Sequence, residues 1–202
     1  NTEQDINFLS NGDPDIAALN TFVGGGSWYF SILYDNSGNG MNLVQTTLAN
    51  QPVGSLVGGK PVMDFTGTQW MTVPTSQAYF KGLHNGQATV IALAKAGNTA
   101  DMNALAVLMA NNGLTGANIG YAIAFDDRAS QSRNNAALTL VTTGAGVSMA
   151  VNDVRNNAWP INQYVILNQV TKTAEVGAQR SMLTVNGVTV TTANIGSSTA
   201  ST

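Results

Sequence analysis

The chain of 202 residues contains no cysteine and a single histidine, and these shortages exclude several kinds of site. Without cysteine there is neither a disulfide framework nor a thiolate metal site, so stability must come from burial and backbone hydrogen bonds. A metal site built from several histidines is excluded as well, and a Ser-His-Asp arrangement would depend on His84 alone. His84 stands in a turn rich in Gly and Asn, so we interpret it as a surface turn residue.

Charge is also scarce, because Asp, Glu, Lys and Arg together make up 9% of the chain. The formal net charge is -3 and the pI is about 4.8. The Lys and Arg residues are scattered, and phosphate binding needs them clustered, so we expect no nucleic-acid partner. No apolar run approaches the roughly 18 residues that cross a bilayer, so we expect no membrane insertion.

Apolar residues and turn formers are what the chain has in quantity. Hydrophobic residues make up 44% and there are 21 glycines, while Asn, Thr and Ser take the place of charges. The length suits one domain with a sizeable core, so we interpret 1–202 as a single domain. Within it we divide an N-terminal segment, 1–55, from a main part, 56–192, and a low-complexity tail, 193–202. Asn1 and this tail suggest a piece of a longer protein.

One helix is expected, over Asp13–Val23. Asp13 as N-cap, Pro14 at the first helical position and an acid in the first turn are typical of a helix start. Apolar residues then recur at helical spacing until Gly24–Gly26 ends the segment.

Everything after this helix has the patterning of strands. The aromatic and β-branched run Trp28–Tyr34 predicts a core strand, and Asp35–Gly40 is its turn. In Tyr121–Asp126 the large residues alternate with alanines, which predicts one inward face and an opposite face that another layer covers in part. Asp101–Ala110 fits a helix or a strand. Further strands are expected at 62–65, 69–73, 89–95, 137–142, 147–151, 164–170, 181–185 and 188–191. Many short strands with Gly and Asn turns predict a sandwich or barrel.

Two short patterns suggest a family. Asp64–Pro74 and Leu183–Val190 each read as two β-patterned runs meeting at a Gly turn. In this order they resemble the opening hairpin and a late hairpin of laminin G-like domains. The resemblance implies an all-β fold, a two-sheet antiparallel jelly-roll sandwich of the concanavalin A-like type, here with one short N-terminal helix.

A second resemblance covers some of the first 52 residues. Glu3–Ile6, Tyr34–Gly40 and Gln45–Pro52 are similar to the opening of the arabinofuranosidase catalytic-domain family and of bacteriophage structural proteins that share it. The enzymes of that family carry adjacent cysteines and a glutamate nucleophile. This chain has no cysteine, and its glutamates are Glu3 and Glu175, so no catalytic residue is carried over. The phage relatives imply a virion surface module.

The residues best placed for binding follow a predicted core strand. Asp126, Asp127, Asn134 and Asn135 stand around a polar loop, where sandwiches often carry binding groups. They could hydrogen-bond sugar hydroxyls or hold a calcium ion through oxygen ligands. The alternative is a solvated turn with a local Asp–Arg pair. As adjacent strand residues, Asp126 and Asp127 face opposite sides and do not form the carboxylate pair, about 5 to 9.5 Å apart, of a glycosidase.

An exposed aromatic ring would complete a sugar site. Trp159 stands before Pro160 in a predicted loop, so it is the best candidate for an exposed stacking platform for a pyranose, the alternative being a core or edge position. Tyr79 is a weaker candidate of the same kind. Trp28 and Trp70 stand in predicted strands, so we expect them in the core.

These observations predict a non-enzymatic bacteriophage virion module, a head decoration or a tail-fibre or receptor-binding domain at the virion surface. Its partners would be capsid or tail proteins, with a host-surface glycan as candidate ligand through Asp126, Asp127, Asn134, Asn135 and Trp159. We expect no cofactor, apart from calcium as a candidate ion, and a homo-oligomer, with a trimer favoured. The alternative is a secreted carbohydrate-binding module or a diverged arabinofuranosidase-like glycoside hydrolase.

Overall fold

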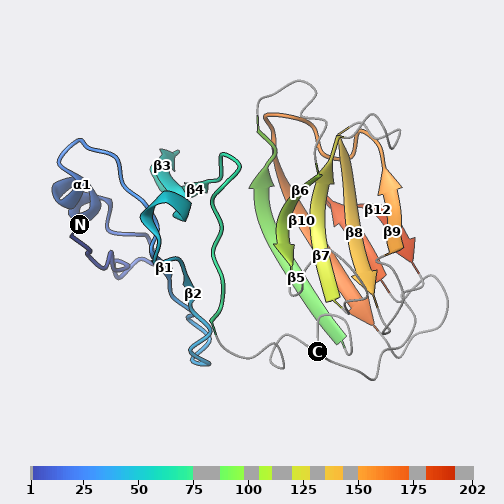
Figure 1. Cartoon of the computed structure of the whole chain (residues 1–202), viewed down its shortest axis with the longest axis horizontal. Coiled ribbons are helices and arrows are strands. Elements are labelled where there is room, and N and C mark those ends of the chain that lie inside the picture. Colours follow the sequence, from blue (N-terminus) through green and yellow to red (C-terminus); the bar gives the residue numbers. More distant parts are fainter. Residues whose placement is uncertain are drawn as a thin grey trace. The chain divides into compact units, whose positions relative to one another are not determined.

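A computed structural model gives the fold of the chain and describes residues 2–74, 87–97, 105–110, 120–127, 135–142, 150–172 and 181–193. It consists mostly of strands in several antiparallel sheets, with one short α-helix (Figure 1). The chain divides into two compact units, Asn1–Ser76 and Gln77–Thr202, and each is described by itself. The all-β class expected from the sequence is therefore confirmed. That 1–202 is a single domain stays a prediction.

The expected helix is present as α1, Ile16–Val23. The N-cap is Asp15, whose side chain accepts a hydrogen bond of 2.9 Å from the backbone N–H of Ala18. Gly24 ends the helix in the left-handed conformation, with φ 58°, which glycine adopts without steric cost. The prediction placed the cap at Asp13, two residues too early.

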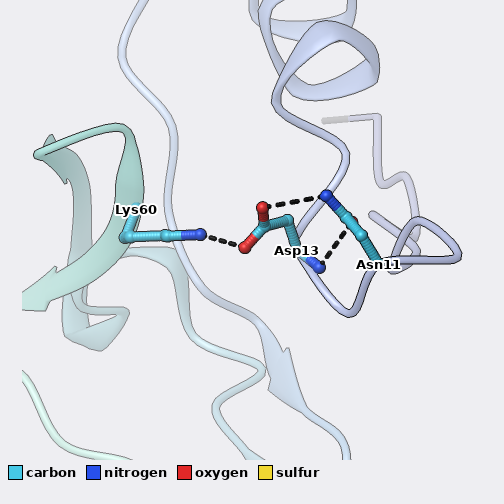
Figure 2. Close-up of polar contacts among 3 residues, drawn as sticks. All are labelled: Asn11, Asp13 and Lys60. Carbon is cyan, nitrogen blue, oxygen red and sulfur yellow. Dashed lines mark hydrogen bonds and ion pairs between the residues drawn. The ribbon is translucent and has the colours of Figure 1, made fainter.

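Asp13 instead ties the loop before α1 to the strand β4, Lys60–Asp64. Its carboxylate forms an ion pair with the Lys60 ammonium and accepts a hydrogen bond of 3.1 Å from the Asn11 amide (Figure 2). The Asn11 side chain in turn accepts from the Asp13 backbone N–H at 3.0 Å. The hydrogen bond from Lys60, followed by its positive charge, lowers the pKa of Asp13. In the described residues this is the pair that joins two separate segments by charge.

The strands of this N-terminal unit are short. Two-residue strands pair with each other, and a longer hairpin turns through Gly58 and Gly59, both at positive φ. The elements are β1 (Ile32–Leu33), β2 (Leu43–Val44), the 3-10 helix η1 (Leu48–Asn50), β3 (Val53–Val57) and β4. The prediction of a core strand over residues 28–34 was wrong. Within this segment only Tyr29 and the two residues of β1 pair with another strand, and the Tyr34 side chain is half exposed. Tyr34 donates its hydroxyl hydrogen bond to Asp5 at 2.9 Å.

The turn after β1 is confirmed, and Asp35 organises it. One oxygen of its carboxylate accepts from the backbone N–H of Ser37 at 2.8 Å, and the other accepts from that of Met41 at 2.9 Å. Hydrogen bonds from Ser37 and then Met41 lower the pKa of Asp35, because they stabilise its charged form. This carboxylate therefore holds the loop closed.

The hairpin expected over residues 64–74 was wrong. Asp64 ends β4, whose partner is the earlier strand β3. Thr72 forms an isolated antiparallel bridge with Val44 of β2, and the residues between, including Gly67, form a bend and no strand. The Gly turn is real, but the two runs beside it pair elsewhere.

Buried amides hold the centre of this unit. Gln51 is 8% exposed and donates to the backbone oxygen of Gln45 at 2.8 Å. Gln45 is 4% exposed, donates to the backbone oxygen of Trp70 at 3.1 Å and accepts from Thr47 N–H at 3.0 Å. Among the described side chains of the unit, the buried apolar ones are Leu19 and Pro52. The unit therefore buries two hydrogen-bonded glutamines and few apolar side chains.

The C-terminal unit contains two four-stranded antiparallel sheets, in the orders β12-β11-β10-β5 and β6-β7-β8-β9. The predicted late hairpin is confirmed, with Asn186 and Gly187 both at positive φ in its turn. The ambiguous segment 101–110 contributes a strand, β6. The strands are β5 (Gln87–Lys95), β6 (Leu105–Ala110), β7 (Gly120–Asp126), β8 (Ala136–Thr142), β9 (Ala150–Arg155), β10 (Tyr164–Lys172), β11 (Ser181–Val185) and β12 (Val188–Ala193).

The two sheets share one apolar core, to which β7, β10 and β11 contribute alternate residues. Ile123 and Phe125 point into it, as the alternation predicted. Ala122 and Ala124 on the opposite face are fully buried too, so that face is also covered. The predicted row at 147–149 lies outside the described residues. The buried core residues are Ala96, Ile123, Phe125, Trp159, Val165, Leu167, Leu183 and Val185.

One glycine in the N-terminal unit is required by packing. A Cβ added to Gly54 would lie 2.2 Å from the ring of Trp28, whose backbone oxygen accepts from Gly54 N–H at 2.8 Å. We expect Gly54→Ala to displace this ring and to lower the free energy of unfolding by about 1–3 kcal/mol, the usual cost of overpacking. Urea denaturation followed by tryptophan fluorescence measures it.

Gly97→Ala is the matched control, since a Cβ there meets nothing within 4 Å. Its unfolding should match that of the wild type. Equal stability of the two variants would mean that the packing of the Trp28 ring does not require a glycine at position 54.

Candidate functional site

The connections that carry the chain from one sheet to the other lie at one end of the C-terminal unit. β5 ends at Lys95 opposite Tyr164, the first residue of β10, and β7 ends at Asp126 opposite Ala136, the first of β8. The β9–β10 connection, residues 156–163, therefore crosses between the sheets beside the β7–β8 turn. Asn162 N–H donates to the Ala96 oxygen at 3.1 Å and fastens this connection to the end of β5. We call this end of the unit the crossover end.

Trp159 fills the core at the crossover end. Its side chain is 3% exposed, and its ring meets the ring of Phe125 edge-on, with centroids 5.7 Å apart and an interplanar angle of 87°. Its backbone N–H donates to the Asn135 oxygen at 3.0 Å. The expected exposed stacking platform was therefore wrong. The loop turns the ring inward, where an aromatic edge-to-face contact adds to the area that it buries.

Two other predicted residues lie beside Trp159. Asp127 is 7% exposed, and one oxygen of its carboxylate accepts from the backbone N–H of Asn135 at 3.3 Å. Asn135 has φ 46°, in the left-handed region that asparagine tolerates better than most residues. The structure thus joins Asp127 to Trp159 through the backbone of Asn135. Asp126, the last residue of β7, is fully buried, and Asn134 lies outside the described residues.

Two polar atoms at this end are buried without a hydrogen-bond partner among the described residues. They are Oδ1 of Asn135, an acceptor, and Nε1 of Trp159, a donor. A buried polar group left unpaired costs about 1–3 kcal/mol, which a water or a ligand hydroxyl would offset. The crossover end therefore has hydrogen-bonding capacity that the described part of the protein leaves unused.

The described acids do not form a strong metal site. No group of three or more His, Cys, Asp or Glu side chains that could hold an ion occurs in the described part of the chain. Calcium takes six to eight oxygens, so an ion at Asp126 or Asp127 would need amide, backbone and water ligands as well. Both carboxylates are buried, and Asp127 already accepts a backbone hydrogen bond.

The remaining aromatic and histidine candidates lie in the N-terminal unit or outside the described residues. Trp70 lies in the N-terminal unit, in no strand, and is 51% exposed, so its expected core position was wrong. Trp28 is half-buried and pairs with Phe30 at 5.0 Å between ring centroids. His84 and Tyr79 lie outside the described residues.

Sequence reasoning missed the buried amides. Asn168 of β10 has its Oδ1 buried without a partner in the described residues, and Gln45 and Gln51 are buried in the N-terminal unit. Amides are mostly exposed in proteins, so nothing in their type predicted this. The one available signal was the position of Asn168 and Gln169 within a strand that is apolar on either side of them.

No protein-family model, no curated protein and no solved structure matches the chain. No helix in the described part of the chain is long and apolar enough to span a membrane. A function can therefore be argued only from the chain's own residues and from the resemblances in its sequence.

Substitution of Trp159 separates the role of its ring from that of its N–H. We expect Trp159→Ala to lower the free energy of unfolding by about 3–5 kcal/mol, as for other buried aromatic truncations. Trp159→Phe keeps a ring beside Phe125 and removes the unpaired Nε1 donor, so we expect a loss of less than about 1.5 kcal/mol. Urea unfolding of both variants is the measurement. If Trp159→Phe were as damaging as Trp159→Ala, Nε1 would have a partner that stabilises the fold.

Proposed function

We propose that the chain is a non-enzymatic surface module of a bacteriophage virion, a head decoration or a tail-fibre domain. In this proposal the N-terminal unit attaches to another virion protein, a capsid or tail component. The observation that carries it is the amount of apolar surface that the N-terminal unit leaves exposed, together with the resemblance of its motifs to phage structural proteins.

Many large apolar side chains of this unit are exposed to solvent. Trp70 and Phe65 are about half exposed, at 51% and 53%, while Leu19 is buried. Contiguous apolar surface on a monomer typically marks a site of protein association. The exposed large apolar residues are Phe8, Leu9, Tyr29, Ile32, Leu33, Tyr34, Leu48, Leu56, Val57, Phe65 and Trp70.

The residues of the motif that resembles the phage proteins stabilise the fold of this unit. Asp35 holds the loop after β1 closed, and Gln45 and Gln51 form the buried amide centre. These residues hold the loops of the unit in place, and an attachment unit requires such a fixed local structure. None of them is part of a group of acids suited to hydrolysis.

We further propose that the C-terminal unit is a concanavalin A-like jelly roll. Two antiparallel sheets around one core, with crossings from β5 to β6 and from β9 to β10, support it. The buried positions of Asp126 and Asp127 support a non-enzymatic role, since a glycosidase presents its carboxylates to substrate across a cleft. Arabinose release from arabinan by the purified chain, abolished by Asp127→Asn, would overturn that role.

The attachment proposal predicts where the chain is found. Quantitative mass spectrometry of density-purified particles from the source should find its peptides at a fixed ratio to a major capsid or tail protein. The double substitution Phe65→Ser with Trp70→Ser should reduce incorporation at least about tenfold, because it removes two exposed anchors of a kind that often dominate interfaces.

Val188→Ser is the matched control, since Val188 is 57% exposed but lies in β12 of the other unit. Its incorporation should equal that of the wild type. Recovery of the chain only as free secreted protein would contradict the virion proposal and favour the carbohydrate-binding alternative.

Glycan recognition at the crossover end is a second candidate function. The observation in its favour is the unused acceptor of Asn135 and the unused donor of Trp159, which match a sugar hydroxyl. Asn135→Gly removes the amide but accepts the same left-handed backbone, so the fold should persist. We expect it to abolish any signal on a glycan array at unchanged melting temperature. A wild-type signal that survives Asn135→Gly would place the sugar elsewhere.

A further inference from the structure

The strand β5 lies at an edge of its sheet with one long side unpaired among the described strands (Figure 1). It is nine residues long, and each residue pairs with β10 in unbroken register from Gln87↔Lys172 to Lys95↔Tyr164. It contains no proline, and Lys95 at its end is its one charged residue. A long, regular, sparsely charged edge is a template for another strand.

The other three edge strands of the two four-stranded sheets differ from β5 in one respect. β12, β6 and β9 each pair with their neighbour through a shift of register, at Leu183/Thr184, Val107/Met109 and Leu138/Leu140 respectively. Such bulges twist an edge and hinder further pairing, and they are a common protection of edge strands. Among the four edges of these two sheets, β5 is the one without this protection.

The outer face along this edge is apolar. Ile91 and Leu93 of β5 are 70% and 68% exposed, and Ile166 of β10, opposite Leu93, is 53% exposed. Lys95 closes the row at one end, with its ammonium 5.4 Å from the centre of the Tyr164 ring. Pairing at the edge would extend this row across two sheets and cover part of it.

We propose that β5 is the contact between two copies of this chain, paired antiparallel about a two-fold axis at Ile91. In that register Ile91 faces its counterpart, Leu93 faces Thr89, and Lys95 faces Gln87. All nine residues find partners, each residue meets one of the same face, and no like charges are opposed. We expect a second copy and not a foreign strand because each copy carries the same unprotected edge, and this antiparallel register opposes no like charges.

The contact would join two four-stranded sheets into one of eight strands. It is isologous, so it closes as a dimer. This differs from the trimer that the sequence favoured. The inference does not depend on the proposed virion role.

Sedimentation velocity of the full chain at concentrations up to about 100 μM tests the proposal. The wild type should form dimers. Ile91→Lys places two ammonium groups face to face at the axis and should raise the dimer dissociation constant about tenfold or more. Ile91→Glu should do the same, and an equimolar mixture of these two variants should recover dimers, seen as heterodimers by native mass spectrometry. Ile91 is highly exposed, so both variants should keep the wild-type melting temperature.

Ile166→Lys is the matched control, on the same outer face but one strand away from the edge. It should change the dissociation constant less than about threefold, since it opposes no symmetric partner. A wild-type monomer at all concentrations overturns the proposal. So does a dimer or trimer that is indifferent to Ile91→Lys, or an equal loss with Ile166→Lys, which would indicate packing face to face.

Discussion

The contact between Trp159 and Phe125 is the one on which the order of the C-terminal unit depends. It closes the shared core at the end where the chain passes from one sheet to the other. Without cysteine no disulfide joins the two sheets, and a large ring at the crossing contributes more area than any aliphatic side chain there could. The same residue fixes Asn135 through its backbone N–H and so positions Asp127 as well.

The N-terminal unit is stabilised by different interactions. Its centre is made of hydrogen-bonded amides, Gln45 and Gln51, and its loops are closed by the carboxylates of Asp13 and Asp35. Hydrogen bonds contribute about 0.5–1.5 kcal/mol each once water is released, less than a well-packed apolar residue. A unit built in this way keeps its shape locally while its large apolar side chains remain available to other surfaces.

Local signals in the sequence predicted the elements that depend on neighbours in the chain. The helix at Ile16–Val23, the turn at Asp35 and the hairpin through Asn186 and Gly187 follow from caps and turn residues. The alternation in β7 identified Ile123 and Phe125 as core residues. Errors arose where distant pairing decides the outcome. Trp159 is buried by a crossing between sheets, and Thr72 pairs with Val44, not with a residue across the Gly turn.

The turn at Asn186 has a chemical consequence for the lifetime of the chain. When asparagine precedes glycine, the glycine nitrogen can attack the side-chain carbonyl carbon and form a succinimide with loss of ammonia, because no side chain obstructs it. Here Oδ1 of Asn186 accepts from Ile166 N–H at 2.9 Å, and its backbone N–H donates to the Ile166 oxygen at 2.8 Å. The pairing that sets the register between β10 and β11 therefore also restrains the amide from deamidation, and this form of ageing must begin with the local opening of the hairpin.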